Sequence, residues 1–201
     1  NGKYMHLVNG HLQLEQTGPT ISTTFTQFYI CKIKQKAAPG GANSWRTFYR
    51  NNNNHLTILH PSGALGSYRN TGGGFRNVVN TGALNQGWKF QDNDRWITLI
   101  VVTYSNHKNE YYVDGVKVGE NNYGGTLGNT RLYRIGLGNQ SLGKLALAGI
   151  INKTASSDEI QYINYMLTSI KNRKFPIGSN YFSIGGNITT NSFQLTSEYI
   201  D

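Results

Sequence analysis

The stretch that decides the fold is Arg95-Trp-Ile-Thr-Leu-Ile-Val-Val-Thr-Tyr104. Its middle, Ile97–Val102, is an apolar run interrupted only by a threonine. A strand that is apolar at both odd and even positions is typical of the centre of a sheet that is covered on both faces. We therefore predict that residues 95–104 form the central strand of a β-sandwich.

Short alternating runs separated by turn residues flank this strand, and this pattern is typical of antiparallel strands. Asp114-Gly115 lies between Glu110–Val113 and Val116–Gly119. It predicts a two-residue hairpin turn, because both central positions of such a turn need a positive φ. Asn9-Gly10 gives the same signal between His6 and Leu14, so a hairpin is predicted there too.

The rest of the chain continues the β pattern. A third hairpin is predicted around Pro61-Ser-Gly63. Further strands are predicted at Phe25–Lys36, Trp45–Arg50, Leu56–His60, Ala64–Arg69, Arg131–Leu137 and Leu145–Ile151. Asn70–Asp94 is long and Gly-rich, so we expect an irregular loop there, of the length that usually serves a function.

One helix is predicted near residues 156–172. Ser156-Ser-Asp-Glu159 is a capping box, in which the serine hydroxyl and the glutamate carboxylate each satisfy a backbone N–H at the helix start. Ile160, Ile163 and Leu167 then fall on one face at helical spacing. Pro176 ends any extension of the helix, and the tail at 176–201 has no place in the expected architecture.

Composition sets the outer limits of the prediction. The chain has 201 residues, one cysteine and a formal charge of +9, and we expect a single domain over residues 1–201. Cys31 lies in the middle of a strand and is expected to be a small buried hydrophobe. No apolar run approaches the ~20 residues of a membrane-spanning helix. The charge suits an anionic partner, but no recognition helix or RNP-like pattern accompanies it, so we do not expect nucleic acid binding.

Three blocks, in order, resemble the laminin-G-like, concanavalin A-like lectin superfamily. The first is residues 95–104, which look like the family's W-x-x-(V/L)-A-V-T-Y strand. The second is Glu110-Tyr-Tyr-Val-Asp-Gly-Val-Lys-Val-Gly119, similar to its Y-V-D-G-x-x-V-G hairpin. The third, Leu147–Ile160, is similar to its closing strand and helix. The resemblance covers roughly residues 20–170, and the third block departs from the family at Asn152-Lys153-Thr154.

The resemblance implies an all-β fold, a two-sheet antiparallel sandwich of the jelly-roll type. We expect the helix to close one open end of the sandwich and to leave the loops of the other end exposed. The fold also hosts glycoside hydrolases, which use two carboxylates that flank the scissile bond. The family's hydrolases carry these as E-x-D-x-x-E on one strand, and that pattern is missing here. We therefore expect a chain that is not an enzyme, with no catalytic residues.

A glycan site needs aromatic platforms and amide groups. The residues of these types near the expected loops are Trp45, Trp88, Tyr123, Asn93 and Asn121, and they are our candidate ligand-binding residues. Asp92 and Asp94 offer the hard oxygen ligands that calcium prefers, so they are candidate ligands for Ca²⁺, the one cofactor the sequence suggests. The histidines are scattered and have no metal-ligand spacing.

Two functions from different classes remain open at this point. The first is a non-enzymatic module that binds a glycan or a protein through its loop end or one sheet face. The second is a structural subunit of a virion or other surface assembly, since jelly rolls serve in capsids and lectins alike. A glycoside hydrolase is a weaker third hypothesis. A homo-oligomer or larger assembly would fit the second function, and both functions suggest an extracellular or surface-exposed location.

Overall fold

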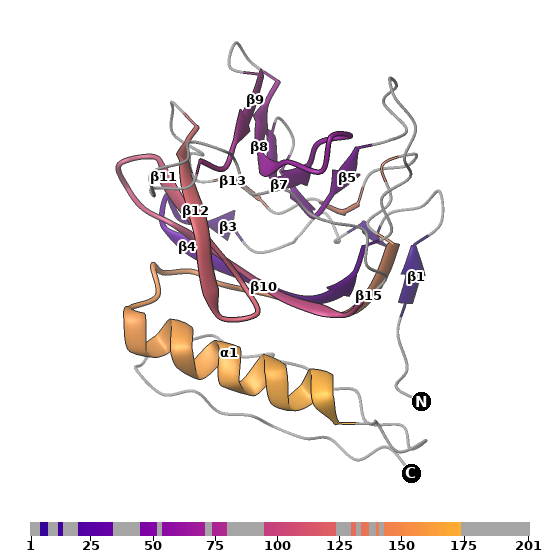
Figure 1. Ribbon diagram of the computed structural model, residues 1–201. Coiled ribbons are helices and arrows are strands. Elements are labelled where there is room, and N and C mark those ends of the chain that lie inside the picture. Colours follow the sequence, from indigo (N-terminus) through magenta and orange to yellow (C-terminus); the bar gives the residue numbers. More distant parts are fainter. Residues whose placement is uncertain are drawn as a thin grey trace.

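The computed structural model of the chain is a sandwich of two antiparallel sheets with one helix on its outside (Figure 1). The structure describes residues 5–7, 12–13, 20–33, 45–51, 54–70, 74–79, 95–123, 130–131, 134–136, 140 and 143–173. The predicted fold class, all-β with two antiparallel sheets, is confirmed.

The first sheet, here called sheet A, has six strands in the order β1-β15-β4-β10-β11-β12. Their bounds are Met5–Leu7 for β1, Gly143–Ile151 for β15, Phe25–Lys32 for β4, Ile97–Thr103 for β10, Lys108–Val113 for β11 and Val116–Asn122 for β12. The predicted central strand is confirmed, because β10 lies between β4 and β11 and every one of its residues is buried.

The second sheet, here called sheet B, has seven strands. Six follow the order β2-β14-β6-β7-β8-β9, and β5 pairs with β7 beside them. Their bounds are Leu12–Gln13 for β2, Arg134–Ile135 for β14, Tyr49–Arg50 for β6, Asn54–Leu59 for β7, Leu65–Arg69 for β8, Gly74–Asn77 for β9 and Arg46–Thr47 for β5. A separate pair joins β3, Thr20–Ile21, to β13, Thr130–Arg131.

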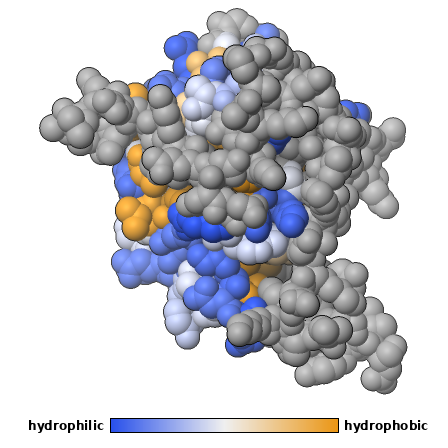
Figure 2. Space-filling model, turned by 45° about the vertical axis from the view of Figure 1, so that its right-hand side comes forward, coloured by the Kyte–Doolittle hydropathy of each residue, from blue (hydrophilic) through white to orange (hydrophobic). Residues whose placement is uncertain are grey.

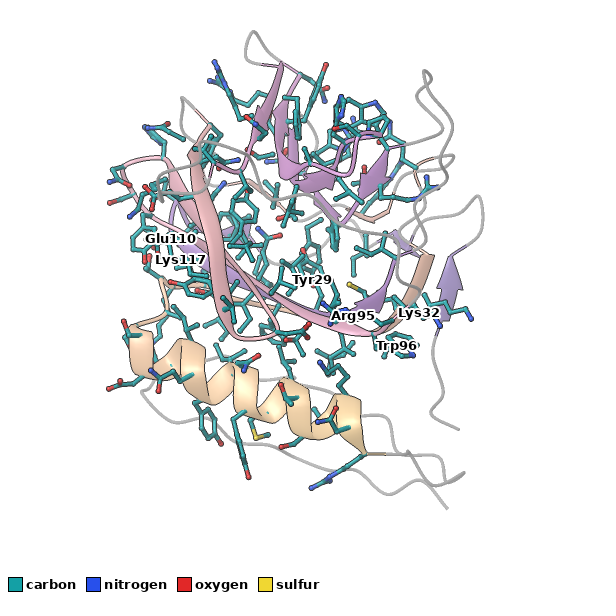
Figure 3. The ribbon with its side chains drawn as sticks, viewed as in Figure 1. Tyr29, Lys32, Arg95, Trp96, Glu110 and Lys117 are labelled. Carbon is teal, nitrogen blue, oxygen red and sulfur yellow. The ribbon has the colours of Figure 1, made fainter. Side chains whose placement is uncertain are left out.

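The main core lies between the two sheets. Odd-numbered residues of β4 and β10 point into it, among them Tyr29, which Figure 3 places between the layers, and Leu99. Sheet B contributes side chains such as Phe48, Leu59 and Leu65, all of which are 2% exposed or less. The period-2 alternation of a strand therefore assigns one set of residues on each central strand to this core.

The other face of sheet A is covered by helix α1, Ser157–Asn172. Figure 1 shows α1 lying along this face, and even-numbered residues of β4 and β10 form a second cluster with it. Its members include Phe28, Ile100, Ile160, Ile163 and Leu167. The expectation that the helix closes an open end is therefore wrong: α1 covers a sheet face, because the apolar even positions of β4 and β10 need burial as much as its own apolar stripe does.

The start of α1 follows the sequence prediction. The Ser156 hydroxyl accepts from the Glu159 backbone N–H at 3.3 Å, and the Glu159 carboxylate accepts from the Ser156 N–H at 2.9 Å. The predicted capping box and helix are confirmed. In the described part of the chain, no helix has the length and apolar character that crossing a membrane requires.

Two of the three predicted hairpins are confirmed. β11 and β12 pair across Asp114 and Gly115, whose φ angles are 48° and 82°. β7 and β8 pair across residues 60–64. The hairpin at Asn9-Gly10 is wrong, because β1 pairs with β15 in sheet A while β2 pairs with β14 in sheet B.

The prediction of an irregular loop over Asn70–Asp94 is wrong in part. Residues 74–77 form β9, which pairs with β8 over four positions. The tail at 176–201, which the sequence prediction leaves unplaced in the architecture, lies outside the described residues.

Candidate functional site

The outer face of sheet B carries a row of large side chains. Arg134, Arg50, His55, Tyr68 and Phe75 lie opposite one another across the five strands from β14 to β9. Directly opposite residues of an antiparallel pair point to the same face of the sheet. On β8 the core is reached by Leu65, three positions before Tyr68, so the period of two places this row on the face away from the core.

Trp45 joins this row and ties its aromatic end together. Its ring makes edge-on contacts, with centroids 4.6 Å from His60, 5.6 Å from Tyr68 and 5.4 Å from Phe75. His60 in turn stacks on Phe75 at 5.0 Å, and edge-on or stacked rings at these distances attract beyond their area of contact. We call Trp45, His55, His60, Tyr68 and Phe75 the aromatic face. All but His55 are partly exposed.

A glycine makes room for this arrangement. A Cβ atom on Gly66 would lie 2.7 Å from the Phe75 ring and 2.1 Å from the Arg76 carbonyl oxygen. A side chain at position 66 would therefore push the Phe75 ring and strand β9 away from β8. The bare backbone lets the ring lie directly over the sheet.

The imidazole rings of the aromatic face are held neutral near pH 7. Burial, and then the nearby positive charge of Arg50, lower the pKa of His55 to about 4. Burial also lowers the pKa of His60. The His55 Nδ1 atom lies 2.9 Å from the Thr47 hydroxyl, which fixes the plane of the ring. The two histidines therefore act here as aromatic rings with hydrogen-bonding nitrogens rather than as cations.

No strand of sheet B contains an aspartate or a glutamate, and none occurs anywhere between residues 16 and 91. The described carboxylates lie in β11, in the turn between β11 and β12, in β12 and in α1 instead. On the side of the molecule drawn in Figure 2, hydrophilic residues make up most of the described surface, and hydrophobic residues form only small separate patches.

The most elaborate carboxylate environment surrounds Glu110 on β11. Its Oε1 accepts from Lys108 at 2.8 Å and Lys117 at 2.7 Å, while its Oε2 accepts from Tyr104 and Tyr112. Burial alone would raise the pKa of this carboxyl, but the four hydrogen bonds outweigh burial and lower it to about 2. A general acid needs the opposite shift, so this environment suits a structural ion cluster. Figure 3 shows Glu110 and Lys117 side by side.

Three further described carboxylates form ion pairs with lysine or arginine side chains. Glu120, directly opposite Glu110, contacts Lys117 at 3.1 Å. Asp114 pairs with Arg95 and Lys171, and Glu159 pairs with Lys153. Across the described ranges, no three His, Cys, Asp or Glu side chains gather as a metal site would require.

The structure brings one predicted ligand-binding residue, Trp45, into the aromatic face. Tyr123 is 2% exposed and belongs to the core between the sheets. Asn121 is 4% exposed, and its amide donates to the Ser67 hydroxyl and the Arg76 carbonyl oxygen. In the described structure both residues serve packing between the sheets. The other predicted residues, Trp88, Asn93, Asp92 and Asp94, lie outside the described residues.

Sequence reasoning did not select His55, His60, Tyr68 or Phe75. The sequence does contain a signal for Tyr68. On a predicted strand with the apolar Leu65 facing the core, the alternation of a strand places Gly66 and Tyr68 on the opposite, outer face. Phe75 had no such signal, because the glycines around it predicted a loop.

Comparison with known proteins supports the fold alone. No protein-family model and no curated protein matches the sequence. A solved structure of the native heptameric SAP-like pentraxin from Limulus polyphemus is 13% identical, with a TM-score of 0.53 over 77% of this chain and 75% of that chain. Domain 4 of AbnA, a GH43 extracellular arabinanase from Geobacillus stearothermophilus solved with arabinotriose, is 15% identical, with a TM-score of 0.52 over 81% of this chain and 77% of that chain.

A third similar structure is part of a much larger protein. Trypanosoma rangeli sialidase in complex with sialic acid is 14% identical, with a TM-score of 0.51, and the match covers 86% of this chain but only 28% of the sialidase. Identities this low say nothing about shared ligands. Together with the two antiparallel sheets, however, these structures establish that the chain has the laminin-G-like, concanavalin A-like jelly-roll fold.

Proposed function

We propose that the chain is a non-enzymatic module that binds a glycan through the aromatic face of sheet B. The observation that carries the proposal is a set of partly exposed rings held by contacts with one another: Tyr68 and Phe75 on the adjacent strands β8 and β9, and Trp45 just before β5. Rings held rigidly lose little conformational entropy when a ligand stacks on them. The C–H faces of a sugar ring are the natural partners of such a platform.

Polar groups in the same row suit the hydroxyl or acidic groups of a glycan. Arg50 lies opposite His55 in the row and Arg134 lies opposite Arg50, and a guanidinium carries several N–H donors in a planar fork. The Gln140 carboxamide is held at the edge of the same face by the Thr47 hydroxyl at 2.8 Å. Aromatic rings next to fixed donors are the usual make-up of small polar-ligand sites.

The distribution of carboxylates supports binding rather than hydrolysis. Glycoside hydrolysis commonly uses two carboxylates on either side of the bond. The strands of sheet B carry none, so a glycan on the aromatic face would meet no such pair from these strands. We therefore propose that a bound glycan leaves unchanged.

The fold is compatible with a bound saccharide, since domain 4 of AbnA was solved in complex with arabinotriose. A glycan ligand also fits the proposed extracellular or surface location, where such ligands are found. Whether calcium takes part depends on Asp92 and Asp94, so the test below includes an arm for it.

A glycan array that carries neutral and acidic glycans tests the proposal. We expect the wild-type chain to bind a defined subset, and Trp45→Ala or Tyr68→Ala to weaken that binding at least tenfold, or about 1.4 kcal/mol. Trp96→Ala is the matched control, because it also removes a tryptophan side chain, but one far from the aromatic face. Trp96 packs against the cluster between sheet A and α1. An array repeated with chelator isolates any calcium requirement.

Two outcomes contradict the proposal. A blank array excludes glycan binding, and equal losses in Trp45→Ala and Trp96→Ala exclude the aromatic face as the contact surface. A third measurement tests the non-enzymatic character: the bound glycan is incubated with the chain and analysed for shorter products, and none are expected.

A further inference from the structure

A groove of about 470 Å³ lies between α1 and the β11–β12 hairpin, on the side of the molecule opposite the aromatic face. Its lining includes Tyr112 and Gly115 from the hairpin and Gln161, Asn164, Tyr165 and Thr168 from the helix. It shares no residue with the aromatic face, and Figure 1 shows α1 and strands β5–β9 on opposite sides of sheet A. A volume of this order suits a small ligand.

One stripe of α1 is buried against sheet A, and the neighbouring stripe of the same helix lines the groove. Gln161, Asn164, Tyr165 and Thr168 lie at positions i, i+3, i+4 and i+7, the spacing that places side chains on one face of a helix. The buried stripe of Ile160, Ile163 and Leu167 holds the helix on the sheet beside them. The lining is therefore carried by a rigid element.

Gly115 sets how closely the hairpin approaches the helix. Its φ of 82° is a conformation that residues other than glycine rarely adopt. A Cβ atom there would lie 2.4 Å from the Asn164 amide nitrogen. The turn and the helix can therefore approach this closely only because position 115 has no side chain.

Two of the lining side chains are already oriented. The Thr98 hydroxyl donates to the Asn164 Oδ1 at 3.0 Å, which fixes the carboxamide and leaves its nitrogen as a donor with no acceptor among the described residues. The Tyr112 hydroxyl donates to Glu110 at 2.9 Å, which fixes the plane of that ring. Groups fixed in advance need not be ordered by the ligand, and this favours affinity.

The chemistry of the lining selects the class of ligand. Among the described residues it combines two tyrosine rings with amide and hydroxyl groups and includes no acidic or basic side chain. Tyr165 is 68% exposed, which leaves most of this side chain open to a ligand. A charged ligand would find no counter-charge among these side chains, whereas a sugar ring offers C–H faces to the tyrosines and hydroxyls to the amides.

We infer that the groove between α1 and the β11–β12 hairpin is a second binding site, which accepts one neutral sugar unit. The Tyr165 ring contacts the face of the sugar, and the Gln161 and Asn164 carboxamides bond its hydroxyls. This site is independent of the aromatic face, so the two are tested separately.

The test is a titration of the full chain with separate neutral methyl glycosides, those of glucose, galactose, mannose and N-acetylglucosamine, and with N-acetylneuraminic acid as the charged probe. Tyrosine ring signals are followed by NMR. We expect saturable shifts with at least one neutral glycoside and none with the acid. Tyr165→Ala and Gln161→Ala should each weaken the binding at least fivefold.

The matched control is Tyr162→Ala, which removes a second exposed tyrosine of the same helix that does not line the groove. It should bind like the wild type. Trp45→Ala should also bind like the wild type in this titration, even where it abolishes array binding. The inference is overturned if no neutral glycoside shifts the signals, if the acid alone binds, or if Tyr162→Ala weakens binding as much as Tyr165→Ala does.

Discussion

The outer faces of the two sheets differ in how they are shielded from water. On sheet A, Phe28, Ile30 and Ile100 are at most 4% exposed, because α1 lies over them. On sheet B, the described structure places rings such as Tyr68 and Phe75 on the outer face, and they stay partly exposed. An apolar face must be covered by another element, whereas a face of rings and polar groups can meet water directly. Packing therefore explains the first face, whereas the proposed function assigns the second face to ligand binding.

The largest effect should come from emptying the helix-covered face. Ile100→Ala removes a 1% exposed side chain from between β10 and α1. We expect a loss of about 2–5 kcal/mol in the free energy of unfolding, since the neighbours can fill such a cavity only in part. Urea unfolding followed by circular dichroism measures it. Val116→Ala, at a side chain 66% exposed, is the control and should change stability by less than about 0.5 kcal/mol.

A loss below about 1 kcal/mol for Ile100→Ala would mean that α1 does not hold sheet A, and the contrast between the faces would fail. By the same reasoning, Tyr68→Ala should cost less stability than Ile100→Ala while it removes glycan binding. If the two variants exchanged these effects, the aromatic face would be a packing feature.

The covered face could be predicted from the sequence, but its cover could not be placed. The apolar run Ile97–Val102 indicated burial on both sides, and the capping box with its stripe indicated a helix. Each signal is local and says what a segment needs, not which surface supplies it. The sequence prediction therefore places the helix at an open end of the sandwich. In the structure its apolar stripe packs instead against the apolar even positions of β4 and β10.

The aromatic face was harder to predict, because it is assembled by pairing between distant strands. Trp45 could be selected as a large aromatic residue near a loop, whereas Phe75 becomes its neighbour only through the pairing of β8 with β9. The Asn9-Gly10 turn signal fails for a related reason. It reports that the chain reverses, but not that β1 and β2 then enter different sheets.

A second effect distinguishes the faces by pH. His55 in sheet B has a pKa of about 4 when folded and 6.5 when free. Above pH 6.5 the ring is neutral in both states, so its full contribution to stability is present. As pH falls from 6.5 to 4, only the unfolded chain takes up the proton, and stability falls by up to about 3 kcal/mol. His55→Gln should flatten this part of the stability profile, measured by urea unfolding at several pH values.

His60→Gln is the comparison for that experiment, and it should flatten the profile less because its ring is more exposed. Glu110 in sheet A should act in a lower range. Its folded pKa of about 2 lies below the ordinary 4.5, so its contribution is complete above pH 4.5 and is lost as pH falls toward 2. A profile between pH 6.5 and 4.5 that does not change in His55→Gln would refute the burial of a neutral imidazole in sheet B.

The smallest effect concerns how α1 begins. Ser156→Ala removes the hydroxyl that accepts from the Glu159 N–H, and it should lower stability by about 1 kcal/mol. Ser157→Ala changes the adjacent serine, which is the first residue of the helix and takes no part in the box, so it isolates the capping contribution. If the two variants were equally stable, tertiary packing of Ile160 and Ile163 alone would hold the first turn. In that case the capping box, from which the helix is predicted, would contribute nothing to the stability of the helix that covers sheet A.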